Sequence, residues 1–204
     1  FYILGDLFET WIGDDDNSPF NTQIKEALSE FTSNGPETFF IHGNRDFLIG
    51  NDFLNKTNIT FFTDQTVIKL GNKRTVILHG DTLCIDDKDY QEFRIKVRSD
   101  NWKAEFLSQT IENRLNICKD LREKSKEAQK NKNELILDVN EYEVKNLFRK
   151  LNYPSLMIHG HTHRPKRHKY SLDNHTCERW VLNDWYNSGS YLAWKDNKLN
   201  SKVL

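Results

Sequence analysis

The sequence predicts an α/β fold in which short, mainly parallel strands alternate with helical segments. Four apolar runs of the kind that forms buried strands each end within two residues of a glycine that is flanked by Asp, Asn or His. A helical pattern separates the first two runs, and this strand–helix–strand order is typical of a parallel sheet. The four runs cover residues 1–4, 38–41, 75–78 and 156–158.

The first expected helix covers residues 21–31, where apolar side chains recur at intervals of three and four residues. The sequence Ser-Asn-Gly-Pro at 33–36 ends it. From residue 154 onward the chain returns to short strands and turns, and we expect further strands at 180–182 and 189–194.

Residues 99–151 contain neither Gly nor Pro, which predicts a long helical stretch. We therefore expect a core built from residues 1–98 and 152–204, with residues 99–151 as a helical insertion. The basic centre of this insertion, 119–134, is typical of a solvated helix face, and a basic lip that meets a phosphorylated lipid is the functional alternative. Its apolar stripe comprises Trp102, Phe106, Ile111, Leu115, Cys118 and Leu121.

The composition is typical of an enzyme of the cytosol. The net charge is -1, so no overall field attracts nucleic acid, and we expect no nucleic-acid partner. The three cysteines are odd in number and widely spaced, which predicts a reducing compartment and no disulfide framework. No apolar run approaches the roughly 20 residues of a membrane span, and no signal peptide is visible. We expect a monomer.

Side chains that bind metals follow the four strand runs. In open α/β sheets, binding sites form at the carboxyl ends of the strands. The donors are carboxylate, amide and imidazole without thiolate, which suits Mn²⁺, with Fe²⁺ or Zn²⁺ as alternatives. A carboxylate such as Asp6 can bridge two ions, and such a pair can clamp the oxygens of a phosphoryl displacement. The candidate ligands are Asp6, Asn44, His79, His161 and His163.

Each candidate also has a purely structural interpretation. Asp6 could cap a helix, and His163 could cap a turn. His79 and His161 could be hydrogen-bonded core histidines, although all four together at successive strand ends favour a metal site. His42 and His159 lie within the strand runs, so we expect them to pack or to hold the ligands by hydrogen bonds.

The order Gly-Asp, Gly-Asn, His-Gly-Asp and Gly-His-x-His resembles the calcineurin-like metallophosphoesterases. Within that superfamily, YILGDLFETWIGDDD, FIHGNRDFLIG, HGDTLCIDDKDYQEFR, SKEAQKNK and IHGHTHRP look like the UDP-2,3-diacylglucosamine hydrolases of lipid A biosynthesis. The similarity covers nearly the whole chain, and Arg45 stands where most relatives in the superfamily have a catalytic His. The resemblance implies an α+β sandwich, the metallophosphoesterase core, with a helical cap.

The resemblance also implies roles for individual residues. Asp6 is similar to the bridging carboxylate, and Asn44, His79 and His161 to the other ligands of the second metal. Arg45 is expected to reach a substrate phosphate, because a guanidinium offers fixed, paired donors. The catalytic set implied is Asp6, Asn44, Arg45 and His79, and the substrate-binding set is Asn44, Arg45, Asp87, Ser125, Gln129, Lys132 and His161. Gln129 stands where the family usually has Asn.

One motif of this family is absent from the chain. The family opens with a strand that ends in Asp-x-His, and we expect that first strand to be missing here. His163 then resembles the one ligand of the first metal that is present. The complete protein is expected to hold two Mn²⁺ ions in its active site.

The implied reaction is water attack on the α-phosphorus of UDP-2,3-diacylglucosamine, which releases UMP and 2,3-diacylglucosamine 1-phosphate. The substrate is a lipid-linked nucleotide sugar, so the protein is expected at the cytoplasmic surface of the inner membrane. Two alternatives stay open: another calcineurin-like phosphodiesterase or phosphatase, and a scaffold that keeps the fold without catalysis.

Overall fold

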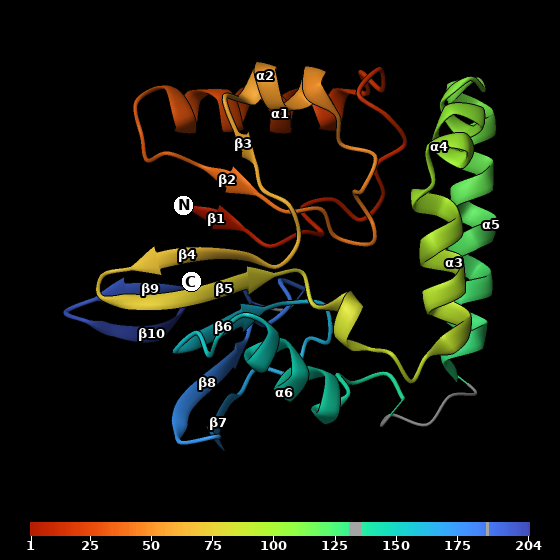
Figure 1. The fold of residues 1–204 in the computed structure, drawn as a ribbon. Helices are drawn as coiled ribbons and strands as arrows, with labels where there is room; N and C mark the ends of the chain where they lie inside the picture. Colours follow the sequence, from red (N-terminus) through yellow and green to blue (C-terminus); the bar gives the residue numbers. More distant parts are fainter. Residues whose placement is uncertain (131–135, 187) are drawn as a thin grey trace. The chain divides into compact units, whose positions relative to one another are not determined.

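A computed structural model describes residues 1–130, 136–186 and 188–204, and Figure 1 shows its ribbon. The chain forms two compact units. The first contains residues 1–62 and 87–137, and the second contains 63–86 and 138–204. Each is described below by itself.

The first unit begins with the predicted strand–helix–strand pattern. Strands β1 (Tyr2–Ile3), β2 (Phe39–Phe40) and β3 (Thr60–Phe61) pair in parallel, in that order. Helix α1 (Pro19–Ser33) connects the first two strands, and α2 (Asn51–Thr57) connects the last two. Both helices lie on one side of this small sheet (Figure 1).

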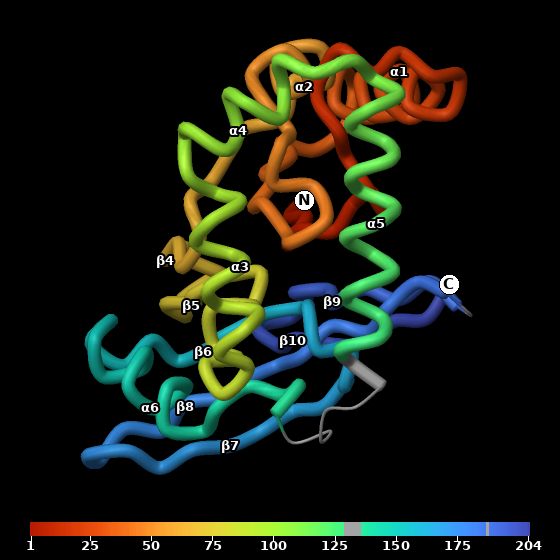
Figure 2. Tube along the Cα trace, turned by 90° about the vertical axis from the view of Figure 1, so that its right-hand side faces the viewer, coloured from red at the N-terminus to blue at the C-terminus, as the bar shows by residue number. Residues whose placement is uncertain are grey.

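Three further helices complete the first unit. Helices α3 (Lys88–Arg98) and α4 (Asp100–Leu107) are separated by Ser99 alone. Helix α5 (Ile111–Lys130) runs back in the opposite direction, as the green trace in Figure 2 shows. Phe106 of α4 is buried in the same apolar cluster as the residues around the small sheet, and Ile117 of α5 packs against that cluster, so α4 and α5 share a core with the sheet. That cluster contains Phe8, Trp11, Ile12, Phe40, Leu48, Ile49, Phe53, Ile59 and Phe106.

The second unit is built on a five-stranded mixed sheet of order β4-β5-β6-β8-β7. The pairs β5–β6 and β6–β8 are parallel, whereas β4–β5 and β7–β8 are antiparallel. The register places Leu78 of β5 opposite His159 of β6, so the loops that follow these two strands start side by side. The strands are β4 (Thr66–Leu70), β5 (Lys73–Leu78), β6 (Leu156–His159), β7 (Arg167–Leu172) and β8 (His175–Val181).

The remaining elements of this unit are short. A 3₁₀ turn, η1 (Asp81–Leu83), follows β5, and α6 (Glu141–Lys150) precedes β6. The buried face of α6, which includes Val144, joins the unit's apolar cluster with strand residues such as Val76. A separate hairpin of β9 (Ser190–Lys195) and β10 (Lys198–Val203) ends the chain.

The predicted α/β class is confirmed, with two differences in detail. The larger sheet is mixed, not mainly parallel. The described part of the predicted helical stretch 99–151 forms three helices, and α6 packs in the second unit while α4 and α5 belong to the first. Phe106, a member of the predicted apolar stripe, is 2% exposed and belongs to a core. Among the described residues, no helix combines the length and apolarity needed to cross a bilayer.

Candidate metal-binding and phosphate-binding site

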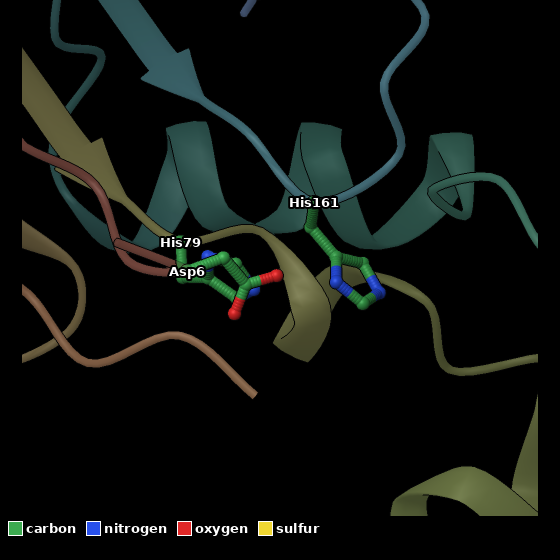
Figure 3. A group of neighbouring side chains, drawn as sticks. All are labelled: Asp6, His79 and His161. Atoms are coloured by element: carbon green, nitrogen blue, oxygen red, sulfur yellow. The ribbon is translucent and has the colours of Figure 1, made fainter. Parts of the chain in front are cut away.

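Two of the predicted metal ligands lie close together in the second unit. His79 directly follows β5 and His161 follows β6, and Figure 3 labels both side chains. Their ring centroids are 5.0 Å apart, and His79 is 1% exposed. The amide of Gly160 donates a hydrogen bond to the carbonyl oxygen of His79 over 2.9 Å, which joins the two loops. Two imidazoles brought together in this way can share one divalent ion.

The backbone of these loops is strained at the ligand positions. His161 and His163 have φ values of 64° and 51°, in the left-handed region that L-residues rarely adopt. Thr162 between them has a buried hydroxyl oxygen without a hydrogen-bond partner. Conformations of this kind cost roughly 1–3 kcal/mol each and concentrate at functional sites. The strain therefore supports a binding role for the Gly-His-x-His loop.

Two carboxylates contact the loops that carry the histidines. Asp64 accepts a hydrogen bond from the amide of His79 at 3.1 Å and another from the Thr82 hydroxyl at 3.2 Å. Asp184 has a carboxylate oxygen 3.7 Å from Nδ1 of His163. Neither residue was predictable from the sequence, because neither belongs to a motif and each reaches its partner only through the fold.

In the first unit, Asp6 lies in the loop that follows β1. Its φ is 55°, and its Oδ1 accepts a hydrogen bond from the amide of Arg45 at 3.0 Å. A Cβ atom on Gly43 would lie 2.2 Å from that same oxygen, so only glycine fits there. Asp6 therefore does not act as a helix cap. It links the first two strand-end loops.

Asp46 holds the same two loops together and was not predicted. Its carboxylate is fully buried and accepts hydrogen bonds from the amides of Leu7 and Gly43, each at 2.7 Å. A carboxylate three residues after a strand-end glycine is a local signal for such backbone bonding. This signal was available in the Gly-Asn-Arg-Asp sequence.

Arg45 carries its guanidinium beside Asp6. Its Nε lies 3.7 Å from Oδ2 of Asp6, and its Nη1 lies 2.6 Å from Oε2 of Glu9. Arg122 of α5 also contacts Glu9, at 2.5 Å, and donates to the Thr10 hydroxyl at 2.8 Å. Two guanidinium groups thus flank one carboxylate next to the Gly-Asn-Arg-Asp loop. Asn44, directly before Arg45, is partly buried in that loop.

The predicted substrate-binding residues fall at different places in the first unit. Asp87 is buried and caps α3, because its carboxylate accepts a hydrogen bond from the amide of Tyr90 at 3.1 Å. Ser125 is exposed on α5. The side chain of Gln129 and the whole of Lys132 lie outside the described residues.

One cavity of about 310 Å³ lies beside α5 in the first unit. Its lining combines the apolar Leu115 and Cys118 with three cationic side chains. The full lining is Thr10, Leu115, Cys118, Lys119, Arg122, Glu123 and Lys126. A pocket whose lining combines apolar and cationic side chains suits a ligand that has both an anionic and an apolar part.

The two strand histidines play the supporting part expected from the sequence. His42 donates from Nε2 to the carbonyl oxygen of Ile49 at 2.8 Å, and burial lowers its pKa to about 4. Burial lowers the pKa of His159 to about 3. Both rings are therefore neutral near pH 7.

The donor set fits a divalent metal ion. Asp6, His79 and His161 each offer one ligand atom of the oxygen or imidazole type that Mn²⁺, Fe²⁺ and Zn²⁺ accept. Gly43 packs against Asp6 in the first unit, and His161 has a left-handed backbone in the second, so the backbone at each of these two donors is constrained within its own unit. These features favour metal ligation over the alternative of ordinary core residues.

Comparisons with known proteins agree with this chemistry. The calcineurin-like phosphoesterase family profile matches residues 1–165. A protein of Aromatoleum aromaticum named UDP-2,3-diacylglucosamine hydrolase is 44% identical over 95% of this chain and 78% of its own length. Proteins with the same name are 44% identical in Aliivibrio fischeri (96% of this chain and 80% of theirs) and 46% identical in Yersinia enterocolitica (93% and 78%).

Proposed function

This chain belongs to the calcineurin-like phosphoesterase family and, within it, to the UDP-2,3-diacylglucosamine hydrolases, and we propose that it hydrolyses the pyrophosphate of UDP-2,3-diacylglucosamine. The products are UMP and 2,3-diacylglucosamine 1-phosphate. The observation that carries the proposal is the guanidinium of Arg45 beside Asp6. A permanent cation with paired hydrogen-bond donors thus lies next to a carboxylate that can bind a metal ion. Binding of a phosphoryl group calls for both.

We propose that Asp6, Asn44, His79, His161 and His163 hold the metal ions, and that Mn²⁺ is the ion used. When bound, divalent cations supply Lewis acidity and make a water molecule acidic enough to attack phosphorus near neutral pH. The chain's own part is positioning. Strained loops and buried carboxylates fix the ligands, so that little reorganisation is needed when the substrate arrives.

Arg45 is proposed to stabilise the charge that builds on the phosphoryl oxygens. Its Nη1 contacts the carboxylate of Glu9, and a phosphate oxygen can replace Glu9 as its partner. Asn44 and His161, which are also proposed metal ligands, are proposed to contact the substrate as well. Asp87, Ser125, Gln129 and Lys132 are proposed to bind the glucosamine head group and its phosphate.

The acyl chains are proposed to contact the helical insertion at α5, because most of the residues that line the cavity lie on that helix. Leu115 is half exposed, and it lines the cavity with cationic neighbours such as Arg122. Burial of each methylene in such a groove stabilises a complex by about 0.8 kcal/mol. Because this substrate is a lipid, we propose that the protein meets it at the membrane surface.

A substrate panel tests the proposal. The protein with Mn²⁺ is expected to release UMP from UDP-2,3-diacylglucosamine, but not to cleave bis(p-nitrophenyl) phosphate at a comparable rate. Chelation should abolish turnover, and Asn44→Ala should lower it by orders of magnitude. Asn55→Ala, which removes an exposed amide of α2, is the control. Full activity after exhaustive chelation would refute a metal-dependent reaction.

A further inference from the structure

A buried arginine in the second unit lies behind the strained histidine loop. Arg179 of β8 is 2% exposed, and three of its nitrogens have partners. Nε donates to the hydroxyl of Tyr170 at 3.0 Å, and Nη2 donates to Oε1 of Glu141 at 3.0 Å. Nη1 lies 3.2 Å from Nε2 of the fully buried His159. A guanidinium removed from water is costly unless its donors are satisfied in this way.

The chemistry of these groups fixes the direction of the hydrogen bonds. Every guanidinium nitrogen carries hydrogen and none can accept, so Nε2 of His159 must be the acceptor. The ring proton of His159 then sits on Nδ1, which lies 2.9 Å from the carbonyl oxygen of Gly160. His159 therefore donates to that carbonyl. The chain of donors runs from Arg179 through His159 to the backbone of Gly160.

This chain of donors ends at the loops that carry the candidate ligands. Gly160 directly precedes His161, and its own amide donates to the carbonyl oxygen of His79. The His159 ring also packs against the other loop, because a Cβ atom on Gly80 would lie 2.8 Å from its Nδ1. One imidazole thus contacts both ligand-bearing loops. The hydrogen bond from this ring fixes the carbonyl of Gly160, the residue directly before the left-handed His161.

We propose that Arg179 is a positioning residue that fixes the tautomer and orientation of His159 and, through the Gly160 carbonyl, holds His161 and His79 ready to bind a divalent cation. Glu141 and Tyr170 anchor the guanidinium from the opposite side. Hydrogen bonds behind metal ligands commonly change metal affinity about 10- to 100-fold. The inference rests on the proposed function only in assuming that these histidines bind metal.

The test measures Mn²⁺ affinity, independently of turnover. Arg179→Met keeps an unbranched side chain but removes every hydrogen-bond donor. Arg179→Lys keeps the charge but lacks the planar, paired donors of the guanidinium. Arg167→Met is the matched control, because Arg167 lies on the neighbouring strand β7, is 46% exposed and pairs with Glu178 away from His159. Electron paramagnetic resonance of free Mn²⁺ should give a dissociation constant about 10- to 100-fold higher for Arg179→Met. Arg179→Lys should recover part of the affinity, and Arg167→Met should match wild type.

Nitrogen NMR of the histidine rings supplies a second measurement. In wild type, His159 should show a single tautomer protonated at Nδ1, and in Arg179→Met this preference should be lost. If Arg179→Met does not fold, Glu141→Gln takes its place, because the Glu141 side chain is 53% exposed, and a several-fold weaker Mn²⁺ affinity is expected. Unchanged affinity and tautomer in a folded variant, even with a lower melting temperature, would overturn the inference. Absence of Mn²⁺ binding to the wild type would instead overturn the proposed function.

Discussion

At the scale of single residues, buried carboxylates hold the strand-end loops. Asp46 is fully buried and accepts two backbone hydrogen bonds that connect the turn after β1 with the loop after β2. Hydrogen bonds to a charged acceptor contribute about 1.5–3 kcal/mol each. This one side chain therefore helps to keep Asp6 and Arg45 at their observed separation.

We predict that Asp46→Asn lowers the free energy of unfolding by about 2–4 kcal/mol. The Asn side chain carries no charge, and it can turn its own N–H groups toward the backbone N–H donors of Leu7 and Gly43. Urea unfolding at pH 7 measures this. Asp52→Asn, an exposed carboxylate of α2, serves as the control and should change stability by less than about 0.5 kcal/mol. Equal stability of the two variants would show that the buried carboxylate is not needed.

The second prediction at this scale concerns Arg45. Arg45→Lys keeps a cation but loses the paired donors that suit a phosphoryl group. We predict a loss of about 2–4 kcal/mol in transition-state stabilisation, measured from kcat/KM, by analogy with the loss of an oxyanion donor. Arg74→Lys, at an exposed position on β5, is the control. Unchanged kcat/KM in Arg45→Lys would mean that only diffuse positive charge matters.

At the scale of elements, an ion pair ties α5 to the loop after β1. Arg114 is 2% exposed and donates to the carbonyl oxygen of Ile12 at 2.7 Å and to Oδ1 of Asp15 at 2.8 Å. Gly13 makes room for it, since its φ is 136° and a Cβ atom there would lie 2.5 Å from the guanidinium. Helix α5 is thereby fixed to the loop after β1 within the first unit.

This ion pair has a consequence for the pH dependence of stability. The hydrogen bond from Arg114 holds the pKa of Asp15 below its usual value of 3.8. The stabilisation is therefore present above pH 3.8 and is lost as the pH falls toward the lower folded-state pKa, because the unfolded chain takes up the proton first. We predict that Asp15→Asn is less stable than wild type at pH 7 and that the difference shrinks below about pH 4.

Urea unfolding at pH 7 and pH 3 measures the Asp15 effect, with Asp120→Asn, an exposed carboxylate of α5, as the control. The Asp15 side chain is 61% exposed, so the effect is expected to be modest. A difference between Asp15→Asn and wild type that does not change with pH would contradict the assignment.

Leu115 tests the role of α5 in lipid binding. Leu115→Gln is predicted to lower kcat/KM for the diacyl substrate more than for a deacylated analogue, because a polar side chain weakens burial of acyl methylenes in the cavity. The ratio of the two kcat/KM values, measured in detergent micelles, is the readout. Phe20→Gln, an exposed aromatic on α1, is the control. If the ratio does not move for Leu115→Gln, the cavity is not an acyl site.

The strands that carry motifs were predictable, and the elements that support them were not. The runs before Gly5, Gly43, Gly80 and Gly160 could be assigned because apolar strands ended at glycine and a metal donor. The short helix α2 and the antiparallel strands β4 and β7 lacked a clear period, and their placement depends on pairing partners far along the chain. Phe106 was assigned to an apolar stripe, but helical periodicity does not say which neighbours that stripe packs against, so its place in the core of the first unit was not predictable.

The same distinction holds for the candidate site. Residue type and spacing predicted the imidazoles that the structure brings together, His79 and His161. They could not predict Asp64, Glu9 or Arg179, because these side chains act through hydrogen bonds formed by distant segments. Contacts of that kind exist only in the folded chain.

At the scale of the whole molecule, the histidines proposed as metal ligands and the arginine proposed to bind phosphate belong to different units. His79 and His161 belong to the second unit, whereas Arg45 belongs to the first. We propose that water attacks the α-phosphorus of UDP-2,3-diacylglucosamine. Attack at this atom determines which product receives the new oxygen atom.

Hydrolysis in H₂¹⁸O, followed by mass spectrometry of both products, distinguishes attack at the two phosphorus atoms. We predict that the label enters UMP and is absent from 2,3-diacylglucosamine 1-phosphate, because the P–O bond at the α-phosphorus is the one that breaks. Label in the sugar phosphate, with none in UMP, would show that water attacks the other phosphorus atom and would refute the proposed reaction.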